Sequence, residues 1–326
     1  MSDPFSRVIG QNQAVELLKR AVERDRVAPA YLFVGANGIG RSLTARCFIE
    51  LLFSINLAET KAALLPSRIA QKNHPDLLWV EPTYQHQGKL LSAKEVVEAG
   101  VKRKALPQIR LEQVREIQRF LSRPPLEAPR AFVVLEHAET MAEAAANALL
   151  KTLEEPKQAT LILIAPSPDS LLPTLVSRCQ RIPFYPLNDV ELQQVLHQLG
   201  HADILQNKLL LSLAQGSPGE AIALVEQFHA IPSSLIEAVV ELLLPSKEKR
   251  SLSLPLELSK QIDATLDLQA QLWLLNYMQH YFWQNSKFSI NSTSILKILE
   301  KSRNYLLSYA QPRLVWEVTL LQLMRI

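Results

Sequence analysis

Cysteine is scarce in this chain of 326 residues, and so are long apolar runs. Cys47 and Cys179 are its two cysteines; their wide separation argues against a disulfide framework and a cysteine-rich zinc site. No apolar run approaches the roughly 18 residues that cross a membrane. The polar start, Met1-Ser2-Asp3-Pro4, lacks the apolar segment of a signal peptide. We therefore expect a cytoplasmic protein without membrane contact or bound zinc.

Charge of one sign is also scarce, because the formal net charge is only +3. Bulk charge therefore gives no argument for nucleic-acid binding, and any DNA contact would have to come from local patches. With 48% hydrophobic and 21% charged residues, the composition is that of an ordinary globular protein. The length predicts two or three domains.

Glycine is the third scarcity, and its distribution is informative. Only 9 glycines occur, and Gly35, Gly38 and Gly40 lie within one stretch that ends in Arg41-Ser42. An apolar run at 31–34 precedes this stretch and a helical pattern at 43–52 follows it. Strand, glycine-rich loop and helix are the context of a phosphate-binding loop, in which backbone N–H groups surround phosphate oxygens. An ordinary strand-to-helix turn would explain one glycine better than three.

The loop departs from the pattern G-x-x-x-x-G-K-[ST] at one position, where Arg41 replaces lysine. Ser42 stands where a hydroxyl holds magnesium in active sites. Two interpretations of Arg41 stay open. It keeps the charge but loses the reach of lysine and binds ATP or ADP weakly, or it fills the pocket and the loop persists as a fold element.

Strand and helix patterns alternate as far as residue 184, which predicts an α/β fold with a parallel sheet. The expected strands are 31–34, 77–80, 131–135, 160–165 and a short edge strand at 182–184; the expected helices are 11–26, 43–52, 109–121 and 141–153. Residues 54–75 are interpreted as irregular and 85–107 as a loop or surface excursion. The role of segment 85–107 stays open; its Lys102-Arg103-Lys104 is more typical of a solvated face than of a DNA contact.

After Pro186 only helical patterns are evident, including one at 220–228. This C-terminal part holds Trp273, Trp283 and Trp316. Large aromatic side chains in a helical region suit a core or a subunit interface, and a core position is the expectation for each of the three.

The second half of a nucleotide site should follow a buried strand as acidic residues. The strand 131–135 is followed by Glu136 and then His137. Glu136 is suited to holding magnesium, although it is one methylene longer than aspartate. A neutral imidazole at His137 cannot supply the negative charge that polarises an attacking water, and Glu139 is badly placed to replace it.

Several further motifs resemble the clamp-loader branch of the AAA+ proteins. The run Ala146–Pro156 is similar to a helix signature of bacterial clamp-loader subunits, and Ser177-Arg178-Cys179 resembles their Ser-Arg-Cys segment. Val8-Ile9-Gly10-Gln11, His74-Pro75-Asp76 and Gly216-Ser217-Pro218-Gly219 occur in the matching order. The resemblance is continuous to about residue 225 and weak beyond it.

Within that family, the departures resemble the delta-prime type of subunit. The gamma/tau ATPases carry a loop lysine, Asp-Glu at the strand end and an arginine after the Gly-Ser of the lid helix; here stand Arg41, Glu136-His137 and Gly219. The resemblance implies an AAA+ core at 1–186, a helical lid at 187–245 and a helical collar domain at 246–326. Residues 53–73 contain no cysteine, so the family's four-cysteine zinc module should be absent.

The resemblance also implies a function for Arg178. It would act in trans as an arginine finger on ATP bound by a neighbouring subunit, where a permanently charged guanidinium stabilises phosphoryl charge. A surface salt bridge is the plainer interpretation of this residue. The implied partners are gamma/tau and delta subunits, with the sliding clamp and primer-template DNA reached through the assembled loader of DNA polymerase III.

On this interpretation the chain has no ATPase activity of its own and requires no cofactor or metal. The first alternative is an active gamma/tau-like ATPase, against which His137 and Gly219 argue. The second is a stand-alone AAA+ DNA-binding protein, which the near-neutral charge disfavours. Lys104, Arg115 and Arg119 are candidates for DNA phosphate contacts, with solvated surface as their more ordinary role.

Overall fold

A computed structural model describes residues 3–55, 57, 59–100, 105–155, 157–243, 253–285 and 290–324. The chain divides into two compact units, residues 1–94 with 107–222 and residues 95–106 with 223–326. The expected three-part division into core, lid and collar stays a prediction, and its boundary at 245/246 lies outside the described residues.

The first unit is built on a five-stranded sheet in the order β2-β5-β6-β1-β7. All four neighbouring pairs are parallel. The strands are β1 (Ala30–Val34), β2 (Leu77–Val80), β5 (Ala131–Leu135), β6 (Ala159–Ala165) and β7 (Gln180–Pro183). The α/β fold expected from the alternating pattern is confirmed, including β7 at the sheet edge, where Pro183 is tolerated.

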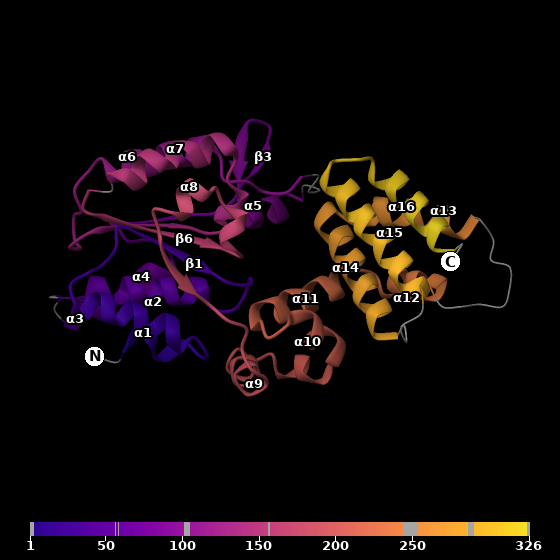
Figure 1. Cartoon of the computed structure of the whole chain (residues 1–326), viewed down its shortest axis with the longest axis horizontal. Helices are drawn as coiled ribbons and strands as arrows, with labels where there is room; N and C mark the ends of the chain where they lie inside the picture. Colours follow the sequence, from indigo (N-terminus) through magenta and orange to yellow (C-terminus); the bar gives the residue numbers. More distant parts are fainter. Residues whose placement is uncertain are drawn as a thin grey trace. The chain divides into compact units, whose positions relative to one another are not determined.

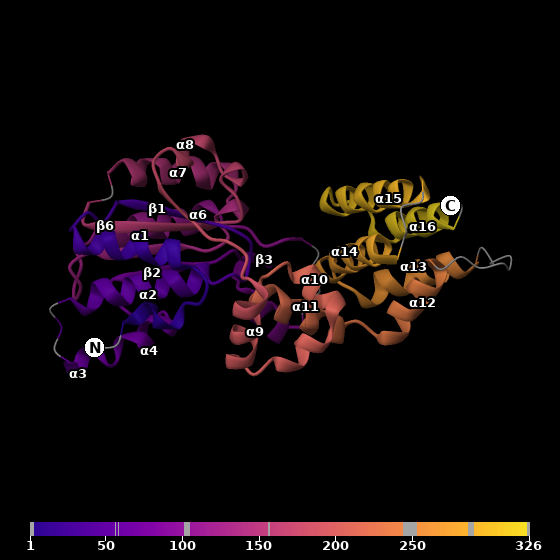
Figure 2. The same cartoon turned by 60° about the horizontal axis from the view of Figure 1, so that its bottom comes forward.

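Helices cover both faces of this sheet (Figure 1). One face is covered by α1 (Asn12–Glu23), α2 (Arg41–Ser54) and α4 (Leu65–Ala70), the other by α6 (Leu111–Leu121), α7 (Glu143–Glu154) and α8 (Pro173–Val176). Successive side chains of a strand point to opposite faces, so Phe33 packs in the first layer and Leu32 in the second. In the turned view, α7 and α8 lie above the strands and α2 and α4 below them (Figure 2).

Two segments in which the sequence pattern predicted no helix or strand contain such elements. Residues 54–75 were predicted to be irregular, but they contain α3 (Glu59–Ala62) and α4, in which Leu65 and Ile69 are buried. The four-residue spacing of these two apolar positions is helical, yet one short helix gives a weak periodic signal.

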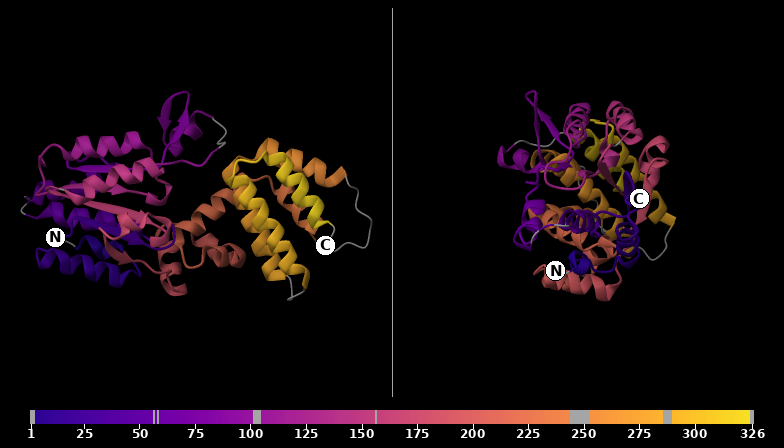
Figure 3. Two further views of the ribbon diagram at one scale, coloured as in Figure 1. Left: turned by 45° about the horizontal axis from the view of Figure 1, so that its top comes forward. Right: turned by 90° about the vertical axis from the view of Figure 1, so that its left-hand side faces the viewer.

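The prediction of a loop at 85–107 was also wrong in part. This segment holds the hairpin of β3 (Tyr84–His86) and β4 (Lys89–Leu91), followed by α5 (Ala93–Glu98). Figure 3 shows the hairpin in purple. Gln87 and Gly88 both have positive φ, which suits a two-residue hairpin turn. Strands of only three residues leave little pattern to detect, and Lys102-Arg103-Lys104 lies outside the described residues.

Asp76 anchors the loop that enters β5. Its buried carboxylate accepts hydrogen bonds from the backbone amides of Leu126, Glu127 and Ala128, each at 2.7 Å. The ring of His74 packs on Phe53, with 4.3 Å between the centroids. The His-Pro-Asp motif therefore fixes the register of β5, and with it the residues that follow this strand.

The rest of the chain is helical, as expected, in its described residues. Its helices are α9 (Asp189–Gln198), α10 (Lys208–Ala214), α11 (Pro218–Ala230), α12 (Ser233–Leu243), α13 (Ser253–Thr265), α14 (Leu268–Asn285), α15 (Ile290–Leu307) and α16 (Pro312–Leu323). Trp273 and Trp316 are buried, and the indole N–H of Trp316 donates to Gln271 at 2.9 Å. The core prediction was wrong for Trp283, which is 64% exposed.

Candidate functional site

The glycine-rich loop lies between the end of β1 and the start of α2. Gly38 and Gly40 have φ of +74° and +100°, a region that favours glycine. Gly40 is the cap of α2, and its carbonyl accepts from the Thr44 amide at 2.9 Å. These glycines therefore serve the backbone geometry that the sequence pattern predicted.

The loop retains donors suited to an anion. Among the described residues, no hydrogen-bond partner is present for the backbone amides from Ala36 to Ser42. They lie at the N-terminus of a 14-residue helix, where the helix dipole favours negative charge. One nitrogen of the Arg41 guanidinium, Nη1, is also buried and has no partner among these residues. This part of the site fits a phosphate group.

The remainder of the Arg41 side chain turns back onto its own loop. Arg41 is 5% exposed, and its Nη2 donates to the side-chain oxygen of Asn37 at 2.5 Å. Burial lowers the pKa of Arg41, and the nearby carboxylates of Glu139 and Glu136 oppose that shift. The side chain thus occupies space inside the loop.

Glu136, which follows β5, is engaged within the chain. One of its carboxylate oxygens accepts from the Ser42 hydroxyl, and the other accepts from the indole N–H of Trp79 at 2.8 Å. Burial acts to raise the pKa of Glu136, but the hydrogen bonds from Ser42 and Trp79 outweigh it and the pKa is lowered. The side chains of Ser42 and Glu136, the two groups expected to hold magnesium, are therefore hydrogen-bonded to each other.

Trp79 is a site residue that sequence reasoning missed, since it had been assigned only to a buried strand. The register explains its position, because β2 pairs with β5 and places Trp79 opposite Val134. An indole N–H that is buried near a strand end needs an acceptor, and this need was the available signal.

His137 has a left-handed backbone, with φ of +52°. Its Nδ1 lies 3.2 Å from a carboxylate oxygen of Glu139. The hydrogen bond with Glu139 raises the pKa of His137, and burial only partly opposes it. One oxygen of Glu139 thus engages the imidazole, while its other oxygen, Oε2, is buried without a hydrogen-bond partner among the described residues. The residue directly after Glu136 is therefore a histidine and not a carboxylate.

The start of α11 packs directly on the glycine-rich loop. The Ser217 hydroxyl donates to the Asn37 carbonyl at 2.6 Å, and the Gly219 amide donates to the Gly38 carbonyl at 3.0 Å. A Cβ atom at Gly38 would lie 2.5 Å from the Glu220 nitrogen. The sequence had singled out 216–219 as a motif, but its contact with the loop could not be read from the pattern.

Gln11 fixes the loop from another side. Its side-chain amide donates to the carbonyls of Ile39 at 3.2 Å and Tyr185 at 2.7 Å, and it accepts from the Tyr185 amide at 3.1 Å. The buried Gln11 therefore ties the segment before α1 to the loop and to the chain that follows β7.

Arg178 lies apart from this loop, just after α8 on the opposite face of the sheet from α2. Its Nη1 donates to the Thr174 carbonyl at 2.9 Å and its Nη2 to Glu154 at 2.7 Å. The side chain is 37% exposed, so the guanidinium is accessible from outside this unit. Of the predicted site residues, the structure brings the loop and Glu136 together and leaves Arg178 separate.

The structure describes two of the three residues that were considered for contact with DNA phosphates. Arg115 and Arg119 are exposed on α6, whereas Lys104 lies outside the described residues. Their contact with DNA phosphates stays a prediction.

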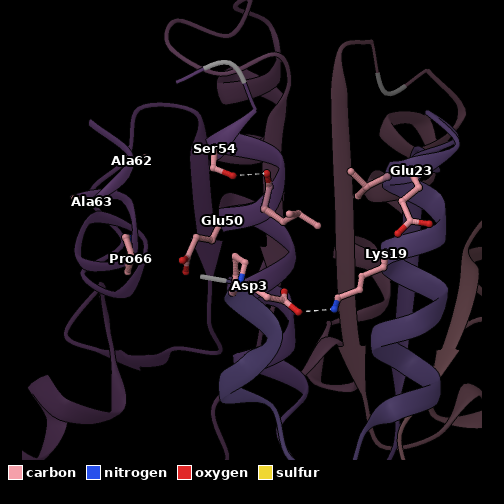
Figure 4. A pocket seen from close by; sticks show the side chains of 11 residues that line it. Asp3, Lys19, Glu23, Glu50, Ser54, Ala62, Ala63 and Pro66 are labelled. Atoms are coloured by element: carbon pink, nitrogen blue, oxygen red, sulfur yellow. Dashed lines mark hydrogen bonds and ion pairs between the residues drawn. The ribbon is translucent and has the colours of Figure 1, made fainter. Parts of the chain in front are cut away.

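A cavity of about 820 Å³ lies elsewhere in the first unit. Figure 4 shows it bordered by Asp3, Lys19 and Glu23 on one side and by Ala62, Ala63 and Pro66 on another. Three of its four charged lining residues are already paired, since Lys19 donates to Asp3 and Glu50 accepts from Arg7. None of its lining residues comes from the glycine-rich loop, so it is not the nucleotide site.

The fold and loop define an α/β protein with a glycine-rich loop of the phosphate-binding type, in which Arg41 takes the place of lysine. A family model described as "DNA polymerase III, delta subunit" matches residues 10–188, more than half of the chain. A second, "Cyanobacterial DNA polymerase III delta prime, C-terminal domain", matches residues 190–323. The chain belongs to the DNA polymerase III delta-prime family.

Individual relatives agree with this assignment. The chain is 33% identical over 180 residues to the DNA polymerase III subunit delta' of Bacillus subtilis, covering 54% of this chain and 48% of that protein. It is 35% identical over 204 residues to the subunit delta' of Pseudomonas aeruginosa, covering 60% and 55%. It thus spans about half the length of each relative.

Among solved structures, a DNA polymerase III gamma subunit-related protein from Thermotoga maritima is similar at 18% identity. That similarity has a TM-score of 0.49 and covers 96% of this chain and 99% of that one.

None of the helices in the described part of the chain combines the length and apolar character needed to cross a membrane.

The pairing of His137 with Glu139 predicts a pH dependence of stability. Because the folded-state pKa of His137 is raised, its contribution is fully present below the usual value of about 6.5 and is lost as pH rises through the folded-state value. Glu139→Gln should therefore lower Tm more at about pH 5.5 than at about pH 8.5. His137 is 42% exposed, so we predict only the sign.

The matched control is Glu143→Gln, which changes an exposed carboxylate at the start of α7. Thermal denaturation of the parent, Glu139→Gln and Glu143→Gln proteins at both pH values measures the difference in Tm. A Glu139→Gln deficit that is equal at the two values, or larger at the higher one, contradicts the pairing.

The contact between α11 and the loop predicts that Gly219→Ala is destabilising. The added Cβ would lie 2.6 Å from the Cα and 3.0 Å from the carbonyl oxygen of Gly38, and these backbone atoms cannot swing aside. Overpacking of this kind costs about 1–3 kcal/mol. Urea unfolding should show the loss, whereas Gln193→Ala on the exposed side of α9 should stay within about 0.5 kcal/mol of the parent. Equal stability of the two variants would contradict the contact.

Proposed function

We propose that this chain is a delta-prime-like subunit of the DNA polymerase III clamp loader that does not hydrolyse ATP itself. The proposal rests on the hydrogen bonds made by the two residues that follow β5. Glu136 is hydrogen-bonded to Ser42 and Trp79, and His137 is hydrogen-bonded to Glu139. His137 thus stands directly after Glu136 where a carboxylate would polarise a water molecule, and it engages one oxygen of Glu139, the next carboxylate along the chain. Arg178, which is exposed and permanently charged, is the remaining group suited to phosphoryl chemistry.

The nucleotide that the family implies fits these residues only in part. The free amides of the loop and the unpaired nitrogen of Arg41 would hold phosphate oxygens. Ser42 and Glu136 would first have to separate before they could hold magnesium. We infer weak ATP or ADP binding at most, no requirement for a cofactor, no zinc, and no hydrolytic step in this chain.

Arg178 would act in trans. On this proposal its guanidinium reaches the ATP held by a gamma/tau subunit and stabilises the charge that builds on the transferring phosphoryl group. The chain would also be a scaffold that assembles with gamma/tau and delta subunits in the cytoplasm. The assembly would place the sliding clamp on primer-template DNA during replication.

The alternative is an active gamma/tau-like ATPase, and the retained loop amides are the observation in its favour. Gly219 argues against it, because this position lies against Gly38 and provides no side chain to reach a nucleotide. The third possibility, a stand-alone DNA-binding protein, would require salt-sensitive DNA binding without partner subunits.

The proposal predicts the effect of Arg178→Ala in a reconstituted loader. The variant should fold normally, because the side chain makes only exposed contacts. ATP turnover at the site that it serves should fall about 10³-fold, the lower range for an arginine finger. Steady-state and single-turnover ATPase assays of the loader measure this loss.

Arg181→Ala is the matched control, since Arg181 is an exposed arginine three residues away on the edge strand. It should leave loader ATPase unchanged. Loader turnover that is insensitive to Arg178→Ala would contradict the finger. Robust turnover by the isolated chain that is abolished by Ser42→Ala would favour the gamma/tau-like alternative.

A further inference from the structure

The guanidinium of Arg178 is held by two different elements. Its Nη1 donates to the Thr174 carbonyl within the one-turn helix α8, and its Nη2 donates to Glu154, the last residue of α7. An arginine side chain has five N–H donors. These two bonds use two of them, and the other three have no partner among the described residues.

The two anchors are themselves fixed. The Thr174 carbonyl also accepts from the Ser177 hydroxyl at 3.1 Å, so the residue before the arginine supports the same acceptor. Leu153, which precedes Glu154, is buried in the same core cluster as Leu175 of α8. The spacing between the ends of α7 and α8 is therefore set by packing, and the carboxylate of Glu154 is delivered to a defined place.

We propose that Glu154 is a positioning residue for Arg178. The inference rests on the proposed function, in which Arg178 acts on a nucleotide held by another subunit. The carboxylate holds one arm of the guanidinium, and the Thr174 carbonyl holds the other. Together they restrict a long and otherwise mobile side chain and leave three donors for phosphate oxygens. Glu154 itself touches no reacting atom.

An inhibitory role for Glu154 would give the opposite effect on ATP turnover. If the ion pair kept Arg178 away from the nucleotide, Glu154 would compete with phosphate for the guanidinium, and removal of the Glu154 carboxylate would accelerate turnover. Exposed ion pairs contribute little to stability, and Arg178 and Glu154 are 37% and 53% exposed. Substitutions at Glu154 are therefore expected to leave the chain folded, and changes in rate can be attributed to Arg178.

The experiment uses the reconstituted loader with the full-length chain carrying Glu154→Ala, Glu154→Gln, Glu155→Ala or Arg178→Ala. Glu155 is the matched control, because it is the adjacent exposed carboxylate and makes no ion pair or side-chain hydrogen bond among the described residues. We expect Glu154→Ala to lower kcat about 10- to 100-fold with KM little changed, the effect of a misplaced catalytic group. Glu154→Gln keeps an oxygen acceptor and should recover most of the rate; Glu155→Ala should match the wild type.

Wild-type or faster turnover by Glu154→Ala would overturn the positioning role, as would a Glu154→Gln variant no better than Glu154→Ala. These results leave the proposed function standing as long as Arg178→Ala is defective. If Arg178→Ala is also as active as the wild type, the finger itself is disproved and the proposed function fails with it.

Discussion

A half-buried carboxylate gains stability from hydrogen-bond donors of its own chain, and Glu136 has two of them. The Ser42 hydroxyl and the Trp79 indole supply these bonds, at the edge of the sheet where β1, β2 and β5 end. The same contacts connect the glycine-rich loop to two neighbouring strands. Breaking them to admit magnesium would leave an indole and a carboxylate to find new partners, so the constraint that stabilises this edge also opposes its use in hydrolysis.

Protein contacts hold the carbonyl groups of the glycine-rich loop, whereas its backbone amides from Ala36 to Ser42 have no partner among the described residues. Gln11 bonds to the Ile39 carbonyl, and the start of α11 bonds to the carbonyls of Asn37 and Gly38. Arg178 belongs to the other helical layer, where Thr174 and Glu154 engage two of its donors. A Ser42–Glu136 pair that is hydrogen-bonded internally and an arginine that is accessible externally are what a subunit would need in order to serve a neighbour's nucleotide.

Much of this arrangement was predictable from sequence, because long apolar strands give strong signals. The strands at 77–80 and 131–135 have the predicted bounds, and Glu136 follows the second of them. The short elements within 54–75 and 85–107 were missed, since helices and strands of three to six residues carry little periodicity. Trp79 and Gly219 could not be recognised as site residues, because their contacts join segments far apart in the chain.

Titration of the chain with ATP in the presence and absence of magnesium shows whether the site still binds a magnesium–nucleotide complex. The loop retains donors for phosphate, whereas Ser42 and Glu136 are bonded to each other. Calorimetry should therefore show either no binding or weak binding with the same affinity under both conditions. Tight binding that depends on magnesium would show that Ser42 and Glu136 separate readily, and would contradict the account of a site that has lost its hydrolytic half.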